Sequence, residues 1–323
     1  MRSEGMSQQA SHNELPSVAS AAEKRRFALC KFFARGASLV VACLGASVLA
    51  GWLFNLEWLK RFHPDWVTMK PNSAFCFILA GLALWLLCPG SATGLKLRVA
   101  QACALTIAVV GLLTLGEYLF SRDLGIDQLL FREHEAEPGS PAPGRMAPAA
   151  AFNFVLLGMA LLFLDVKTGL GRRPAQYFNL TAATVTLFAF VGYFYDVESG
   201  YWIVPIASIA FHTIVAFLLC CLGILFARPD QGIMVVLTSD RGEGVVTRRT
   251  LPAVLLLPVL LGWFERLGHQ AGFYGPGFGS ALLATSLVII LGCVIWRSAG
   301  ALNRIDSDRL RAEEARLRLA AAV

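Results

Sequence analysis

The chain has 323 residues, of which 56% are hydrophobic and only 15% are charged, and its mean hydropathy is +0.60. Soluble domains average about 45–50% apolar and about 25% charged residues, so this composition argues against a soluble globular fold. The net charge of +6 does not indicate nucleic-acid binding here, because Lys and Arg also concentrate in the cytoplasmic loops of membrane proteins.

Eight apolar runs are each long enough to cross about 30 Å of hydrocarbon as a helix. A helix satisfies its own backbone hydrogen bonds in lipid, so the sequence predicts an all-α, polytopic membrane protein. The predicted spans are 36–54, 72–88, 98–120, 149–165, 177–195, 207–227, 251–267 and 279–296.

The first 35 residues are polar and end in the basic segment KRRFALCKFFAR, which predicts a disordered basic tail. If this tail is cytoplasmic, most of the 28 Lys and Arg residues fall in the inner segments, as membrane topology favours. An even number of spans then places both termini in the cytoplasm. We expect a membrane domain over 36–296 and a cytoplasmic linker or signalling helix over 297–323.

One stretch of the chain recurs. It reads MKPNSAFCFILAGLALWLL at 69–87 and MAPAAAFNFVLLGMALLFL at 146–164. Both copies place Pro two residues after Met, Phe at plus eight and Gly at plus twelve. A weaker copy at 209–227 keeps Phe217, lacks the Pro and has its Gly two places later, at Gly223. The Pro suits the first turn of a helix, and the Gly suits close helix packing.

The alternate spans share a second feature, a Gly followed by aromatic residues at the outer end. The four ends read AGWLFN (50–55), GEYLFS (116–121), GYFYD (192–196) and GWFER (262–266). Together with the recurring stretch, they predict four tandem helical hairpins related by an axis along the membrane normal, the fourth being the most degraded.

Three connecting segments are predicted in more detail. The outer loop 121–148 begins with a short amphipathic turn and becomes Pro/Gly-rich and irregular. The inner loop 228–250 is either a small β-hairpin around Asp240–Gly244 or an irregular connector. The tail continues the last span as a helix, supported by (i, i+4) pairs such as Arg309 with Glu313.

Polar groups at membrane depth are costly and therefore point to function. Glu117 lies at the outer end of the third span, and His212 takes the place of Asn72 in the third copy of the recurring stretch. With four aromatic rings at similar depth, they predict an outward-facing pocket for a small molecule. Alternatively, Glu117 reaches water, and His212, Asn72 and Asn153 bond between helices. The predicted ligand-binding residues are Trp52, Asn72, Glu117, Tyr118, Tyr193, His212 and Trp263.

No motif in the chain indicates catalysis or a metal site. Phosphate-loop, nucleophile-elbow, kinase and cyclase signatures are missing, so we expect no enzymatic activity from these residues, and the sequence assigns no cofactor. HEAE at 134–137 does not have the spacing of a zinc site. The eight Cys lie in or beside the spans, which argues against disulfides.

Four segments resemble the multi-span (MASE-like) N-terminal sensor regions of bacterial signalling proteins: MKPNSAFCFILAGLAL, GEYLFSRDLGIDQLLF, GRMAPAAAFNFVLLGMALLFLD and AFHTIVAFLLCCLGILFARP. The tail RLRAEEARLR is similar to the helix that connects such regions to PAS, histidine kinase or diguanylate cyclase modules. The resemblance implies a sensor in the bacterial inner membrane, surrounded by lipid. It also implies a homodimer formed through the C-terminal helix and a cytoplasmic output domain. These 323 residues contain no such domain, so a truncated product, an excised sensor and a stand-alone relative all stay open. The resemblance implies no particular ligand.

Two other classes of function stay open at this point. The repeats and the polar groups within spans also suit a transporter or channel, although the predicted spans are apolar near the midplane, where transporters place polar or broken helices. A membrane assembly subunit that only packs against other subunits is the second alternative.

Overall fold

The computed structural model describes residues 21–321, apart from 62, 64–65, 89, 91, 134–141, 169–172, 196–208 and 241. Every regular element in these residues is a helix, as the all-α prediction requires. The elements are α1 (Ala21–Leu53), α2 (Glu57–Lys60), α3 (Pro71–Leu87), α4 (Leu95–Phe120), the 3-10 helix η1 (Ile126–Gln128), α5 (Pro148–Leu162), α6 (Pro174–Tyr195), α8 (Phe211–Ala227), α9 (Ile233–Thr238), α10 (Gly242–Gln270) and α11 (Pro276–Ala321).

Four helical segments among the described residues are long and apolar enough to cross a membrane: α1, α4, α10 and the Gly277–Ser298 part of α11. The helices α3, α5 and α8 are apolar but shorter. α1 starts at Ala21, so the second half of the predicted tail is helical, and the first 20 residues lie outside the described part. All eight Cys are free.

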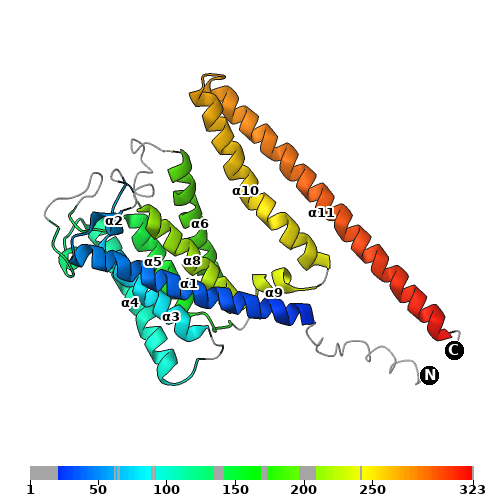
Figure 1. Cartoon of the computed structure of the whole chain (residues 1–323), viewed down its shortest axis with the longest axis horizontal. Helices are drawn as coiled ribbons and strands as arrows, with labels where there is room; N and C mark the ends of the chain where they lie inside the picture. The colour runs from blue at the N-terminus through cyan, green and yellow to red at the C-terminus, as the bar shows by residue number, and fades with distance from the viewer. Residues whose placement is uncertain are drawn as a thin grey trace, which may run out of the picture.

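Six helices form one bundle (Figure 1). α1 lies along α3, α4 along α5, and α6 along α8; α3 also packs on α4, α5 on α6, and α8 on α1, which closes the ring. α3, α5 and α8 contact one another at the centre. We call this the six-helix bundle, and we name its two ends the η1 end and the α9 end after the short helices found there.

The recurring stretch forms the centre of the six-helix bundle. Its three Phe residues at plus eight are Phe77, Phe154 and Phe217, each fully buried. Their ring centroids lie 4.9, 4.9 and 4.7 Å apart, within the range in which aromatic pairs attract. The three copies therefore meet around a pseudo-threefold axis that passes through the rings.

The Gly residues of the first two copies allow close helix contact. A Cβ on Gly81 would lie 2.5 Å from the carbonyl oxygen of Ser38, and a Cβ on Gly158 would lie 2.6 Å from that of Ala104. In the third copy, Gly223 faces Leu84 of α3 instead of α6, which accounts for its shifted position. Pro71 and Pro148 occupy the first helical turns of α3 and α5, as predicted.

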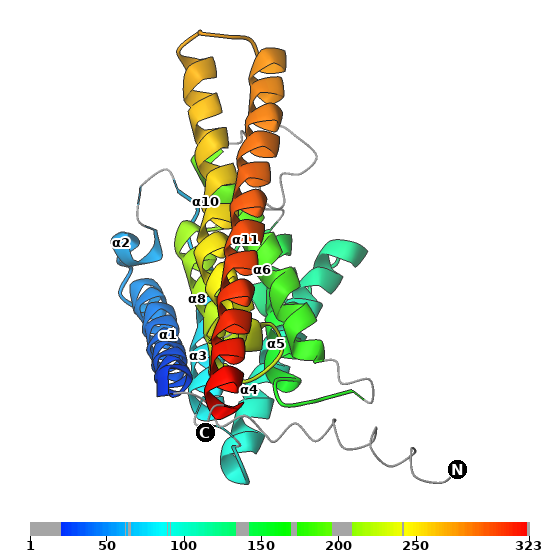
Figure 2. The same cartoon turned by 90° about the vertical axis from the view of Figure 1, so that its right-hand side faces the viewer.

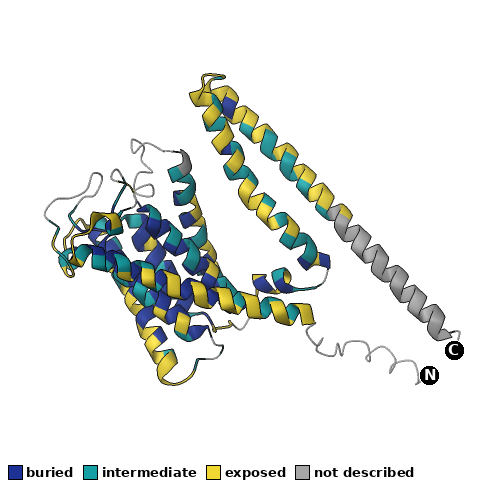
Figure 3. Ribbon diagram, in the orientation of Figure 1, coloured by how far each residue is buried: buried dark blue, intermediate teal, exposed yellow. Residues whose placement is uncertain are grey.

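The fourth helix pair stands outside the ring. α10 packs mainly on α11, with smaller contacts to α9 and α6. Figure 2 shows this α10–α11 pair projecting past the end of α6. In each of the two helices only 6% of the most apolar 18-residue stretch is buried, and Figure 3 shows exposed residues along α10 and along the coloured part of α11. The sequence predicted four helical pairs around one axis. In the structure only the first three pairs surround it, because they already close the ring.

The C-terminal ends of the three central helices are joined at the α9 end by Arg228. Its guanidinium makes two bonds to the Asp165 carboxylate, at 2.6 and 2.7 Å. It also donates to the carbonyls of Leu87 and Gly90 at 3.1 and 3.2 Å. A cation is favoured at helix C-termini, where carbonyl groups remain unpaired.

The inner loop 228–250 is neither a β-hairpin nor irregular. Residues Ile233–Thr238 form α9, and α10 begins at Gly242. Arg26 of α1 pairs with Asp240 and donates to the Thr238 carbonyl at 2.8 Å. The basic segment at the start of α1 therefore fixes the connection through which the six-helix bundle leads into α10.

Candidate functional site

Glu117 is the best-defined of the predicted site residues. It lies in the last turn of α4 and is 0% exposed. The chain reverses after α4 through Ser121, whose φ of 49° is left-handed. The backbone N–H of Leu124 then donates to Glu117 Oε1 at 2.9 Å. The start of the outer loop thus folds back over the carboxylate and covers it.

The helix η1 brings a second buried carboxylate to Glu117. Gly125, with φ of 73°, turns the chain into η1, and Asp127 in η1 is 2% exposed. Asn72 of α3 donates to the carbonyl of Ile126 at 3.0 Å. This predicted ligand residue therefore has a clear structural role, since it fixes the helix that carries Asp127.

Arg145 lies between the two buried carboxylates. Its Nε donates to Asp127 Oδ2 at 2.6 Å and lies 3.4 Å from Glu117 Oε2. Its Nη2 lies 3.9 Å from Asp123 Oδ1. The guanidinium carbon also lies 5.5 Å from the centre of the Tyr118 ring, which favours the cation. We call Glu117, Asp123, Asp127 and Arg145 the acidic site.

Burial alone would lower the pKa of Arg145. The hydrogen bond to Asp127 and the charges of Asp127 and Glu117 outweigh burial, so the pKa lies above its ordinary value. Arg145 therefore remains charged at every physiological pH, and it supplies one fixed positive charge to a site with three carboxylates.

Surrounding contacts hold the loop around Arg145. Gly144 has φ of 74°, and a Cβ there would lie 2.7 Å from the carbonyl oxygen of Asp127, so only glycine fits. Glu133 accepts from the Gly144 N–H at 2.6 Å and from Lys70 at 2.9 and 3.0 Å. Gln128 accepts from the Glu133 N–H at 2.9 Å and donates to the Pro143 carbonyl at 3.0 Å. The acidic site is therefore preorganised by its own loop.

Three of the predicted aromatic residues take equivalent places in the six-helix bundle. Each donates a hydrogen bond to the carbonyl of the first residue of a recurring stretch. Trp52 bonds to Met69 at 2.9 Å, Tyr118 to Met146 at 3.1 Å and Tyr193 to Ile209 at 2.6 Å. These side chains join the C-terminal ends of α1, α4 and α6 to the starts of α3, α5 and α8. Of the three, only Tyr118 contacts the acidic site.

The remaining two predicted residues lie apart from Glu117. His212 is 3% exposed and lies against the backbone of Lys60 in α2. Asn72 and His212, at the same repeat position, thus each reach the backbone of a short helix, η1 for Asn72 and α2 for His212. Trp263 lies on α10, 40% exposed, with its ring 5.4 Å from that of Phe264. It does not join the others, because α10 stands outside the six-helix bundle.

The sequence prediction missed Asp123, Asp127 and Arg145. All three lie in the loop that it treated as mainly irregular, although Arg145 directly precedes the second Met of the recurring stretch. The segment HEAE at 134–137, considered for metal binding, lies outside the described residues. The chain matches no protein-family model, no curated protein and no solved structure, so no relative indicates its function.

Proposed function

We propose that the chain is the signal-input module of a bacterial inner-membrane signalling protein, with eight spans in helical pairs and both termini in the cytoplasm. Helix α11 carries this proposal. It runs without a break over 46 residues, and its Gly277–Ser298 part is apolar enough to cross a membrane. At 1.5 Å per residue it is roughly 69 Å long, more than twice a hydrocarbon core of about 30 Å. Such a helix can carry a change from the membrane into the cytoplasm.

The orientation rests on the distribution of basic residues. α1 starts with the basic segment at 24–35, and Arg228, Arg248 and Arg249 also belong to the α9 end. Since cytoplasmic segments carry the excess of Lys and Arg, the α9 end faces the cytoplasm. The acidic site at the η1 end then faces the periplasm.

The weak attachment of the α10–α11 pair supports a relay role. Its helices are almost unburied, and they meet the six-helix bundle through α9 and α6. Elements with few buried contacts move at low cost, and switching needs two packings that differ by a few kcal/mol. A rearrangement at the η1 end would shift the helices of the six-helix bundle. α1 and α6 would pass the shift to α10, directly or through α9, and α10 would pass it to α11.

The proposed partners follow from the same arrangement. Lipid covers the exposed apolar side chains, two copies associate through the cytoplasmic part of α11, and an output domain receives the signal. We propose no nucleic-acid partner, no cofactor and no catalytic role for these residues.

The test measures how kinase output depends on the rotational phase of the part of α11 that follows Ser298. The full chain is fused to a histidine kinase output domain with a transcriptional reporter, and residues are inserted after Ser298. Two inserted residues rotate the following helix by about 200°, whereas seven restore the original phase to within about 20°. We expect the two-residue insertion to change basal output at least threefold and the seven-residue insertion to leave it within twofold. Equal output from both proteins at equal expression would contradict a relay through α11.

A transporter or channel is the alternative, and buried polar pairs inside the six-helix bundle favour it. Asn153 donates to Thr186 at 2.9 Å, and Asn179 donates to the Cys221 carbonyl at 3.0 Å. These donors are already bonded to neighbouring helices, and the three central Phe rings fill the axis. Substrate uptake into proteoliposomes that carry the purified chain would favour a transporter over a signal-input module.

A further inference from the structure

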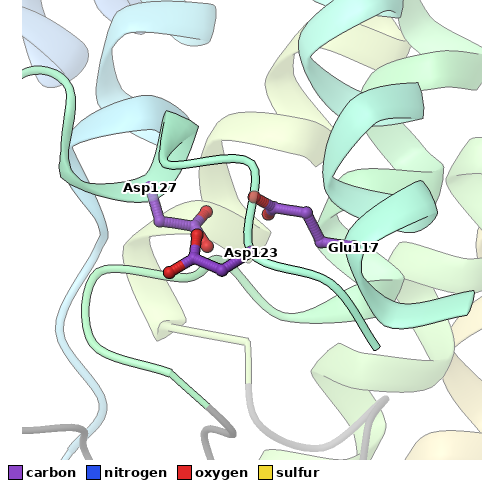
Figure 4. A group of neighbouring side chains, drawn as sticks. All are labelled: Glu117, Asp123 and Asp127. Carbon is purple, nitrogen blue, oxygen red and sulfur yellow. The ribbon is translucent and has the colours of Figure 1, made fainter. Parts of the chain in front are cut away.

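Three carboxylates converge at the η1 end of the six-helix bundle (Figure 4). Glu117 comes from the last turn of α4, Asp127 from η1, and Asp123 from the loop between them. One oxygen of each lies within 4.8 Å of the others. Glu117 and Asp127 are buried, whereas the Asp123 side chain is 69% exposed. The cluster is thus a buried pair of carboxylates that opens to solvent at Asp123.

Two oxygens of the buried pair accept no hydrogen bond within the described residues, although Arg145 Nε lies 3.4 Å from one of them, Glu117 Oε2. Both Glu117 Oε2 and Asp127 Oδ1 are inaccessible to solvent. A buried polar atom without a partner costs about 1–3 kcal/mol, and more when it is charged. Arg145 lies within 3.9 Å of all three carboxylates and supplies one positive charge. When all three are ionised, the acidic site carries an excess of negative charge that a bound cation would offset.

We propose that Glu117, Asp123 and Asp127 bind one divalent cation of the size of Ca²⁺. Ca²⁺ lies about 2.3–2.6 Å from its oxygen ligands, so two ligands on opposite sides of it are separated by up to about 5 Å. The three oxygens lie within this separation of one another. Mg²⁺ requires about 2.0–2.1 Å and a near-octahedral shell, so two ligands on opposite sides of it are separated by no more than about 4.2 Å. Water and backbone carbonyls complete the shell of the larger ion.

Arg145 and Asn72 act as positioning residues for this site. Arg145 bonds to Oδ2 of Asp127, which holds the carboxylate and leaves Oδ1 for the ion. Asn72 fixes the Ile126 carbonyl, so η1 cannot turn away from α4. A bound ion would join α4, the loop and η1 into one unit. Its loss would leave the buried carboxylates to repel each other and release the loop from α4.

The binding experiment uses the full chain, purified in detergent, stripped with a chelator and titrated with Ca²⁺ alone by calorimetry. We expect one Ca²⁺ per chain, with a Kd of about 10⁻⁴–10⁻³ M as in extracellular Ca²⁺ modules, and an increase in Tm on binding. Mg²⁺ should bind at least tenfold more weakly. Asp127→Asn and the exposed Asp123→Asn should each weaken Ca²⁺ binding at least tenfold.

Glu57→Gln is the matched control, because Glu57 is an exposed carboxylate in the first outer loop that pairs with Lys60 and Arg61. It should leave Ca²⁺ binding unchanged. If Asp127→Asn does not fold, Asp123→Asn decides, since its side chain is mostly in solvent. Absence of saturable binding, equal binding by Asp123→Asn and the wild type, or a Tm that follows pH but not Ca²⁺ would each overturn the cation site.

The cation would be the stimulus of the input module, and this part of the inference rests on the proposed function. In the kinase fusion, removal of Ca²⁺ should change reporter output at least threefold in the wild type and leave the output of Asp123→Asn unchanged. Calorimetric binding without a reporter change would retain the site and remove its signalling role. A reporter response to Ca²⁺ in a chain that binds none would overturn the site and leave the input function standing.

Discussion

The six-helix bundle and the α10–α11 pair have similar hydropathy but differ in what covers their apolar side chains. The most apolar stretches of α1 and α4 are 33% and 39% buried. Those of α10 and α11 are comparably apolar, yet only 6% of each is buried. Hydropathy therefore identifies helices suited to lipid, but it does not tell which of them pack together.

The two regions differ in how closely their small residues let neighbouring helices approach. In the six-helix bundle, Gly45, Gly81, Gly111 and Gly158 each lie where a Cβ would come within about 2.6 Å of a backbone oxygen on a neighbouring helix. On α11, Gly292 has no atom within 4 Å of its Cβ position. Helix association in membranes depends on such close packing, because lipid is as apolar as the side chains. Where α10 and α11 meet, Gly279 approaches the flexible Glu265 side chain instead of a backbone oxygen, and most of the apolar surface of the pair stays uncovered.

The largest effect is expected at the central Phe rings. Phe154→Ala removes the ring that contacts both Phe77 and Phe217. A Phe-to-Ala cavity in a protein core lowers the free energy of unfolding by about 3–5 kcal/mol. We expect a loss of about 3 kcal/mol, because the surroundings of a membrane protein are apolar and the transfer part of the cost is smaller. The measurement is the free energy of unfolding in mixed micelles.

The matched control for that change is Phe278→Ala on α11, where the side chain is 64% exposed. It should change the free energy of unfolding by less than about 0.5 kcal/mol, as surface substitutions do. An equal loss from both substitutions would mean that the α10–α11 pair is packed as tightly as the six-helix bundle, which would remove the contrast between the two regions.

Gly158→Leu tests close packing with a somewhat smaller effect. The new Cβ would lie 2.6 Å from the Ala104 oxygen, so α4 and α5 would have to separate. Overpacking of this kind costs about 1–3 kcal/mol. Gly292→Leu on α11 adds the same side chain in open space and should be neutral or slightly stabilising, since Leu favours helix more than Gly does. The measurement is Tm together with the monodisperse yield, and a neutral Gly158→Leu would contradict the helix contact.

The sequence predicted the helices well because the features that specify them are local. Apolar runs located the helices, and Pro71 and Pro148 marked two helix starts. The Phe shared at plus eight was recognised as part of the repeat, but its place at the centre of the six-helix bundle was not predicted. The absence of the fourth pair from the ring could not be predicted, because a helix facing lipid and a helix facing protein have equally apolar sequences.

The acidic site was predicted only in part. Glu117 was recognised because a carboxylate at the end of an apolar run is costly. Its partners Asp127 and Arg145 depend on left-handed turns at Ser121, Gly125 and Gly144, which reverse the loop onto α4. Their spacing along the chain, 10 and 28 residues from Glu117, carries no periodic signal that would relate them to it.

The smallest effect is expected at the aromatic residues in the C-terminal parts of α4 and α10. Tyr118→Phe removes the hydroxyl that donates to the carbonyl of Met146, a residue that is 1% exposed. A buried carbonyl without its donor costs about 1 kcal/mol. Trp263→Phe, at the corresponding place in the fourth pair, should lower the free energy of unfolding by less, because Trp263 is 40% exposed. The turn after α10 is closed instead by Tyr274, whose hydroxyl donates to the Glu265 carbonyl at 3.0 Å. Chemical unfolding of both variants measures the difference. If Trp263→Phe costs as much as Tyr118→Phe, the fourth pair closes its hairpin as the first three do, and the α10–α11 pair differs from them only in position.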